Sequence, residues 1–152
     1  ALTGEGEVPP GRYSSESIQQ TEVPGRNLVF LALAASVAVA RGFSTVGIAV
    51  HSGDHPLYAD CQPEFIERVQ KVFDQAFRGK VSLWAPFLHL SKGEIVQVGV
   101  QYGAPFELTY SCYRGGPSHC GVCATCLERQ DAFRWAGFDD PTPYEFKEEF
   151  HE

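Results

Sequence analysis

The sequence lacks the features that would place a protein at or across a membrane. Its longest apolar run, residues 28–40, has 13 residues and includes Ser36, whereas a membrane-spanning helix needs about 20. The first residues show neither the charged region nor the apolar centre of a signal peptide. These absences predict a protein without a membrane segment.

Basic residues are also few. The chain has 12 lysines and arginines against 19 aspartates and glutamates, for a formal net charge of −7. Residues 139–152 hold six of the acids and one lysine, so most of the net charge lies in this acidic tail. The nearly neutral remainder offers no broad basic face for a phosphate backbone, which predicts no direct binding to DNA.

Methionine is absent, and cysteine is scarce outside one short stretch. The five cysteines are an odd number, and four of them lie between Cys112 and Cys126, which does not suit a disulfide framework. We therefore expect a reducing compartment and a cytoplasmic location. A chain that begins with Ala1 and contains no methionine also fits a fragment or one chain of a split enzyme.

The length of 152 residues predicts a single domain. Glycine, proline, serine and acids crowd residues 1–24, which we expect to form a loop. The rest divides by pattern into an α/β core at 25–110, a cysteine motif with a helix at 111–138, and the acidic tail at 139–152.

Alternating helical and strand patterns predict an α/β fold, with a parallel sheet and flanking helices. Short runs at 46–51 and 81–87 predict two strands, and the first, which is β-branched, is expected to be buried on both faces. Helices are expected at 27–41, 63–77, 91–102 and from the cysteines to about residue 135.

Local signals predict where these helices begin and end. Asn27 is the expected N-cap of the first helix and Gly42 its expected stop. This helix is apolar nearly all round, so we expect it to be buried. Ser91 and Glu94 form a capping-box pattern, and Gly137 is expected to end the last helix.

The stretch SCYRGGPSHCGVCATC contains four cysteines with the spacing C-x7-C-x2-C-x2-C. Thiolates so grouped favour tetrahedral zinc, although an iron–sulfur cluster and buried free thiols are alternatives. His119 is a further candidate ligand beside Cys120. Since four thiols fill every position of tetrahedral zinc, we expect a structural metal held by Cys112, Cys120, Cys123 and Cys126.

Polar residues gather after the first predicted strand, where parallel sheets bind their ligands. The group comprises Asp54, His55, Tyr58, Asp60, Cys61 and Glu64. One interpretation is a ligand-binding loop, and the other is a solvated loop before a helix start that favours acids. Cys61 likewise suits either a nucleophile or a small core residue.

Three residues near helix starts are candidates for binding phosphate. Lys92 lies in the first turn of its predicted helix, where the helix dipole disfavours a cation unless an anion binds there. An exposed lysine tolerated at this position is the alternative. Arg26 and Asn27 open the first predicted helix and are similar candidates.

Four stretches occur here in one order: VPGRNLVFLALA, GIAVHSGDHPLYADCQPEF, APFLHLSKGEIV and SCYRGGPSHCGVCATCLERQDAF. Together they resemble the 7-cyano-7-deazaguanine synthase family of queuosine biosynthesis. The resemblance implies an adenine nucleotide alpha hydrolase-like (PP-loop) fold. It also implies ATP-dependent conversion of 7-carboxy-7-deazaguanine and ammonia to the nitrile preQ0 through adenylated intermediates, with Mg accompanying ATP and with a structural zinc.

The resemblance also implies roles for single residues. It assigns zinc to the four clustered cysteines and catalytic roles to Lys92 and Cys61. It places the nucleotide near Arg26 and Asn27. The deazaguanine substrate would contact Asp54, Tyr58, Asp60 and Glu64.

Two substitutions depart from the family pattern. Gln62 stands where the family has arginine, and Ala59 where it has proline. The missing arginine removes a planar fork for a carboxylate or phosphate. This supports, as an alternative, a related ATP-dependent synthetase with another carboxylate or protein substrate. A separate alternative is a non-catalytic zinc module that binds a partner.

The family's ATP loop, S-G-G-x-D-S, does not occur in the sequence. Without the backbone N–H groups of that loop, pyrophosphate is not cradled. We therefore expect this chain to be inactive alone and to pair with an ATP-loop segment. A homodimer is also expected from the resemblance.

Overall fold

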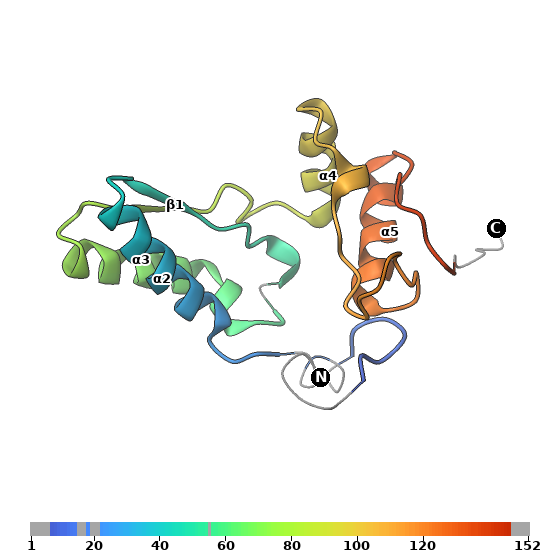
Figure 1. Ribbon diagram of the computed structural model, residues 1–152, viewed down its shortest axis with the longest axis horizontal. Helices are drawn as coiled ribbons and strands as arrows, with labels where there is room; N and C mark the ends of the chain where they lie inside the picture. Colours follow the sequence, from blue (N-terminus) through green and yellow to red (C-terminus); the bar gives the residue numbers. More distant parts are fainter. Residues whose placement is uncertain (1–6, 15–17, 19–21, 55, 147–152) are drawn as a thin grey trace. The chain divides into compact units, whose positions relative to one another are not determined.

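The computed structural model describes residues 7–14, 18, 22–54 and 56–146 (Figure 1). The chain forms two compact units, one from Val23 to Ser91 and the other from the residues up to Glu22 together with those from Lys92 onward. The boundary falls inside the predicted 25–110 core. His55, much of the predicted N-terminal loop and the end of the acidic tail lie outside the described residues, and the single-domain organisation stays a prediction.

The first unit, residues 23–91, is an α/β arrangement around two parallel strands. Strands β1 (Thr45–Gly47) and β2 (Ser82–Trp84) pair in parallel, with Val46 opposite Leu83. The predicted parallel pairing is confirmed, but both strands are shorter than the predicted runs. One further bond, from the Ile48 N–H to the Trp84 carbonyl, continues the pairing beyond β1.

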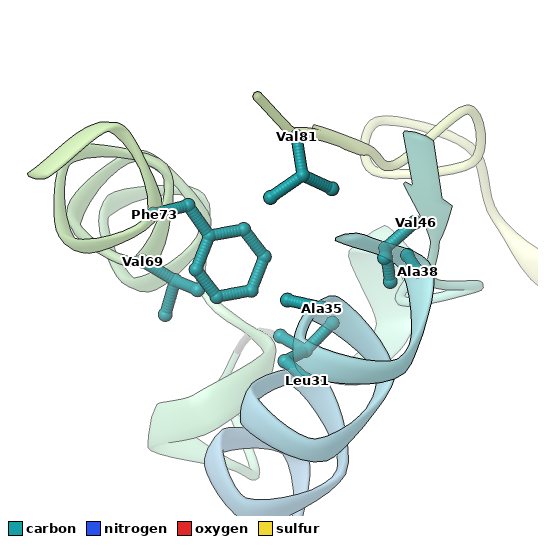
Figure 2. Close-up of a cluster of buried hydrophobic side chains, with 7 residues drawn as sticks. All are labelled: Leu31, Ala35, Ala38, Val46, Val69, Phe73 and Val81. Atoms are coloured by element: carbon teal, nitrogen blue, oxygen red, sulfur yellow. The ribbon is translucent and has the colours of Figure 1, made fainter. Parts of the chain in front are cut away.

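Helices α2 (Arg26–Ala40) and α3 (Pro63–Ala76) flank the strands, and the single-turn 3-10 helices η1 (Ser52–Asp54) and η2 (Ala59–Cys61) lie between β1 and α3. Proline in the first turn of α3 suits a position where its missing N–H has no helical partner. Figure 2 shows the core of this unit, where side chains from both helices converge. The buried residues are Leu31, Ala35, Ala38, Val46, Val69, Phe73 and Val81.

Helix α2 corrects two predictions. Gly25, with φ 68°, is the N-cap in place of Asn27, whose side chain bonds a distant turn instead of the helix end. The helix is also not buried all round, because Phe30 and Leu33 are 61% and 62% exposed. Its predicted stop is confirmed, since Gly42 has φ 78° directly after the last turn.

The second unit contains α4 (Lys92–Gln101), η3 (Phe106–Leu108) and α5 (Ala124–Ala136). Helices α4 and α5 pack together through Val96 and Phe133, with the Phe106 ring edge-on to Phe133. Gly93 allows this close contact, because a Cβ there would lie 2.1 Å from the Trp135 ring, which would have to shift. Gly137, at φ 79°, ends α5 as predicted.

No helix among the described residues is both long and apolar enough to cross a membrane.

Candidate metal centre and ligand loop

The four clustered cysteines converge on one point. Their sulfur atoms all lie within 4.8 Å of one another, and no disulfide joins them. Cys123 and Cys126 are fully buried, while Cys112 and Cys120 are 5% and 6% exposed. Cys123 is the residue before α5, and Cys126 lies in its first turn, so the helix start fixes half of the donor set. Four sulfurs at this separation fit a tetrahedral metal with bonds of about 2.3 Å.

Hydrogen bonds to sulfur prepare this site for thiolates. The N–H groups of Val122 and Cys123 donate to the Cys120 sulfur at 3.4 and 3.3 Å, and that of Cys120 points at the Cys112 sulfur at 3.5 Å. The Thr125 hydroxyl lies 3.2 Å from the Cys123 sulfur. Such contacts stabilise the charged form of a thiol.

The thiols differ in how readily they lose a proton. Burial opposes ionisation of Cys123, but hydrogen bonds from Thr125 and from backbone N–H groups prevail and lower its pKa to about 6. Burial raises the pKa of Cys120 and that of Cys126, and the neighbouring Cys123 thiol adds to the rise at Cys126. One thiolate is thus ready at neutral pH, and a metal must displace the protons of Cys120 and Cys126.

His119 does not belong to the group of converging ligand atoms. Its Nε2 accepts a hydrogen bond from the Ser111 N–H at 2.9 Å, and its ring lies between those of Tyr110 and Tyr144. Burial lowers the pKa of His119, and the Arg129 charge lowers it further. This histidine therefore supports the cysteine loop as a neutral, packed ring.

A buried ion pair next to this loop was missed by the sequence analysis. Arg129 of α5 contacts Asp140 through its Nε at 3.1 Å, and both side chains are less than 10% exposed. Burial opposes ionisation of Asp140, but hydrogen bonds from Arg129, Tyr144 and Thr142 prevail and lower its pKa. Asp140 had been counted with the acidic tail, and no sequence signal linked it to a helix residue eleven positions earlier.

In the first unit, three residues with different predicted roles contact one another. They are Asn27, predicted to bind the nucleotide, Asp60, predicted to bind the substrate, and Cys61, predicted to be catalytic. The Asn27 N–H donates to the Asp60 carboxylate at 3.0 Å, and the Asn27 side-chain amide donates to the Asp60 carbonyl at 3.0 Å. The same amide lies 3.3 Å from the Cys61 sulfur. These contacts tie the start of α2 to η2 and involve residues that are predicted to bind ligands.

Cys61 is buried against Val50 and Ile66. Burial raises its pKa to about 11, and the carboxylates of Asp54 and Asp60 add to the effect. The thiol is therefore protonated at neutral pH, which favours the core-residue interpretation over an ionised nucleophile.

Three of the remaining predicted site residues of this unit lie between η1 and the first turn of α3, and the fourth, Arg26, opens α2. Asp54 is partly buried and pairs with His51 at 3.1 Å, and Tyr58 packs against the cluster that contains Cys61. Glu64 is exposed in the first turn of α3. Arg26 is close enough to lower the pKa of Cys61, against the larger upward effects.

Lys92 belongs to the other unit, where it pairs with Glu128 of α5. Both side chains are about one-third exposed. The ion pair explains how a lysine is accommodated in the first turn of α4, where the helix dipole disfavours it. Its role with a nucleotide stays a prediction.

The fold and the cysteine centre together define an α/β protein with a parallel strand pair and a four-cysteine site able to hold a metal. The family model described as queuosine biosynthesis protein QueC matches residues 1–137. The chain belongs to this family, which confirms the resemblance and the predicted fold class.

Curated relatives agree with the family match. A protein of Chelativorans sp. named 7-cyano-7-deazaguanine synthase is 50% identical over 147 residues, and proteins of Brucella ovis and Brucella suis with the same name are 49% identical. Each alignment covers 95% of this chain. The chain spans 63% of the length of these relatives.

Proposed function

We propose that this chain is the metal-bearing and substrate-binding part of a 7-cyano-7-deazaguanine synthase. The observation that carries the proposal is the identity of about half of all aligned residues to relatives of that name, over 95% of this chain. The reaction would convert 7-carboxy-7-deazaguanine, ammonia and ATP to the nitrile preQ0. Because a carboxylate is a poor electrophile, ATP would first turn it into an adenylate with release of pyrophosphate. Ammonia would then displace AMP to give an amide, and a second adenylation of the amide oxygen would let that oxygen leave with AMP to give the nitrile.

We propose zinc as the metal of the four-cysteine centre. The donor set is all thiol and buried, which suits zinc and leaves no coordination position for a reacting water. When bound, zinc would supply cross-linking and not catalysis. It would join the loop that begins at Cys112 to the first turn of α5.

In the substrate loop, one pair of predicted residues supports a role other than ligand binding. Asn27 and Asp60 bond each other, so we assign them to holding α2 against η2. Asp54 and Tyr58 remain candidates for direct contact with the deazaguanine. A carboxylate accepts hydrogen bonds from a guanine-like N–H edge, and a tyrosine ring stacks on a flat bicyclic ring. Glu64 and Arg26 remain proposed ligand residues at the rim of this loop.

An apolar groove in the first unit supports pairing with an ATP-loop segment. It has a volume of about 500 Å³ and lies between α2 and β1, where Leu33, Val37 and Phe43 are all more than half exposed. Large exposed apolar surfaces commonly mark docking sites. The relatives are longer than this chain, and we propose that a segment corresponding to their additional length covers this groove.

The test is reconstitution of turnover. The chain would be assayed with 7-carboxy-7-deazaguanine, ammonia and MgATP, alone and when co-expressed with the unaligned segment of the Chelativorans relative. We expect AMP release and the nitrile, detected by mass spectrometry, only when the segment is present. Nitrile formation by the chain alone would show that the inactivity proposal is wrong.

Two variants separate docking from chemistry. Leu33→Asp should prevent co-purification of the segment, because it places a charge in the apolar groove. Lys92→Ala should leave co-purification intact and abolish turnover if the lysine acts on the nucleotide. A stable complex that binds ATP but yields no nitrile would contradict the synthase proposal itself.

A further inference from the structure

We propose that residues 142–146 form a strap that controls how fast the four-cysteine site exchanges its metal. Two backbone hydrogen bonds join the strap to the metal-binding loop. The Glu145 N–H donates to the His119 carbonyl at 2.9 Å, and the Phe146 N–H donates to the Cys120 carbonyl at 3.3 Å. Tyr144 and His119 also form a parallel bridge. The proposal rests on the proposed metal site.

The strap passes against the loop at Gly121. A Cβ on this residue would lie 1.7 Å from the Phe146 carbonyl oxygen and 2.8 Å from its carbonyl carbon. Backbone atoms cannot move aside as the end of a flexible side chain can. Closure of the strap therefore requires glycine between Cys120 and Cys123.

A hydrogen bond and an ion pair connect the strap to α5. The Tyr144 hydroxyl donates to the Asp140 carboxylate at 2.5 Å, and Asp140 is held by the buried Arg129 guanidinium. The Tyr144 ring packs against the cysteine cluster itself. The anchor and the strap are thus one continuous arrangement from α5 to the metal ligands.

A second segment covers another part of the loop. The Gly11 N–H donates to the Val122 carbonyl at 2.8 Å, Pro10 forms an antiparallel bridge with Cys123, and Val8 packs on the cysteines. The loop is therefore held by two segments that are far apart in the sequence. A chelator must touch the metal or a sulfur to remove the metal, so release requires local opening of this cover.

The test compares two glycines of the same loop. Gly121 and Gly115 have φ of 78° and 72°, but a Cβ at Gly115 would meet no atom within 4 Å. Gly121→Ala and Gly115→Ala therefore carry similar backbone strain, and only the former collides with the strap. The intact protein would be loaded with Zn²⁺, and release to the chromogenic chelator 4-(2-pyridylazo)resorcinol would be followed by absorbance.

We expect Gly121→Ala to release zinc at least about tenfold faster than the unmodified protein, and Gly115→Ala to stay within about twofold of it. Loading with Co²⁺ should give the same thiolate-to-metal absorption spectrum in both variants, which shows an unchanged ligand set. Equal release rates from the two variants would overturn the strap while leaving the metal site intact. Failure of the unmodified protein to bind Zn²⁺ or Co²⁺ would overturn both.

A second pair of variants decides the question if Gly121→Ala does not fold. Tyr144→Phe removes only the hydroxyl that donates to Asp140, while Tyr102→Phe removes one from a residue just after α4 that is 80% exposed. We expect Tyr144→Phe to speed release by about fivefold, the effect of one lost hydrogen bond, and Tyr102→Phe to change it little. The same rate for both would overturn the proposal.

Discussion

The two units of this chain are stabilised in different ways. The unit from Val23 to Ser91 has a core of aliphatic side chains and Phe73, and it leaves one apolar side of α2 exposed. The unit from Lys92 onward buries four thiols and an Arg–Asp ion pair. The first unit therefore exposes apolar side chains on α2, whereas the second contains buried polar groups that are stable only when paired. Stability in the first unit thus rests on its apolar core, and in the second it also involves buried polar contacts and a site able to hold a metal.

Metal removal should give the largest effect and should separate the two units most clearly. Structural zinc contributes about 10–16 kcal/mol of apparent binding free energy in small zinc domains. Treatment with EDTA should therefore abolish hydrogen-exchange protection at residues 111–136 and leave α2 and α3 protected. Cys61→Ser is the control variant, because Cys61 lies outside the ligand group, and EDTA should remove protection at residues 111–136 in it as in the unmodified protein. Equal loss of protection in both units would contradict the expected difference between them.

Breaking the buried ion pair should give the next largest effect. Asp140→Asn leaves Arg129 buried without its counter-charge, which should lower the free energy of unfolding by about 3–5 kcal/mol. Asp131→Asn is the matched control, because its pairs with Arg12 and Arg134 are exposed, and it should lose about 0–1 kcal/mol. Urea unfolding of the metal-loaded protein measures both.

The Asp140 pair also predicts how stability depends on pH. Because the pKa of Asp140 is lowered in the folded state, its contribution is present above the unfolded pKa near 3.9 and is lost as pH falls through the folded pKa. Asp140→Asn should remove this part of the acid dependence. An unchanged difference between wild type and Asp140→Asn from pH 6 down to pH 3 would contradict the prediction.

Two leucines of α2 sharpen the contrast on the apolar side. Leu31 is 3% exposed and Leu33 is 62% exposed. Leu31→Ala should destabilise the chain by about 2–5 kcal/mol because it leaves a cavity, whereas Leu33→Ala should change stability by about 0.5 kcal/mol or less. Similar losses in thermal or urea unfolding would show that the exposed face of α2 is covered in the isolated chain.

The most local prediction concerns a single thiol. With a pKa of about 11 against an ordinary 9.0, Cys61 should react with iodoacetamide at pH 8 about 100-fold more slowly than an unperturbed thiol. Its rate should rise up to about pH 11 without levelling near pH 9. Asp54→Asn should speed the reaction, since that carboxylate raises the pKa. Peptide mapping by mass spectrometry distinguishes Cys61 from the clustered cysteines.

Several structural features could be predicted because their signals are local. The C-x7-C-x2-C-x2-C spacing brings sulfurs together within a short loop, and Gly42 and Gly137 end helices through their own backbone angles. The strands were overestimated because a β-branched run continues past Gly47, whereas only one further bond, from the Ile48 N–H to the Trp84 carbonyl, follows the last paired residue. The prediction that α2 is buried all round was wrong, because an apolar side chain favours burial but does not specify which segment packs on it.

The sequence by itself determined the α/β class, the parallel strand pair, the helix stops and the four thiols, since each follows from spacing or side-chain chemistry over a few residues. Tertiary structure alone decided that Asn27 bonds Asp60, that Arg129 holds Asp140, and that Gly121 meets the Phe146 backbone. In each of these pairs, contact depends on where the fold brings separate segments of chain. A hydrogen bond or a collision depends on distances of a few ångströms, which residue types and spacing do not specify.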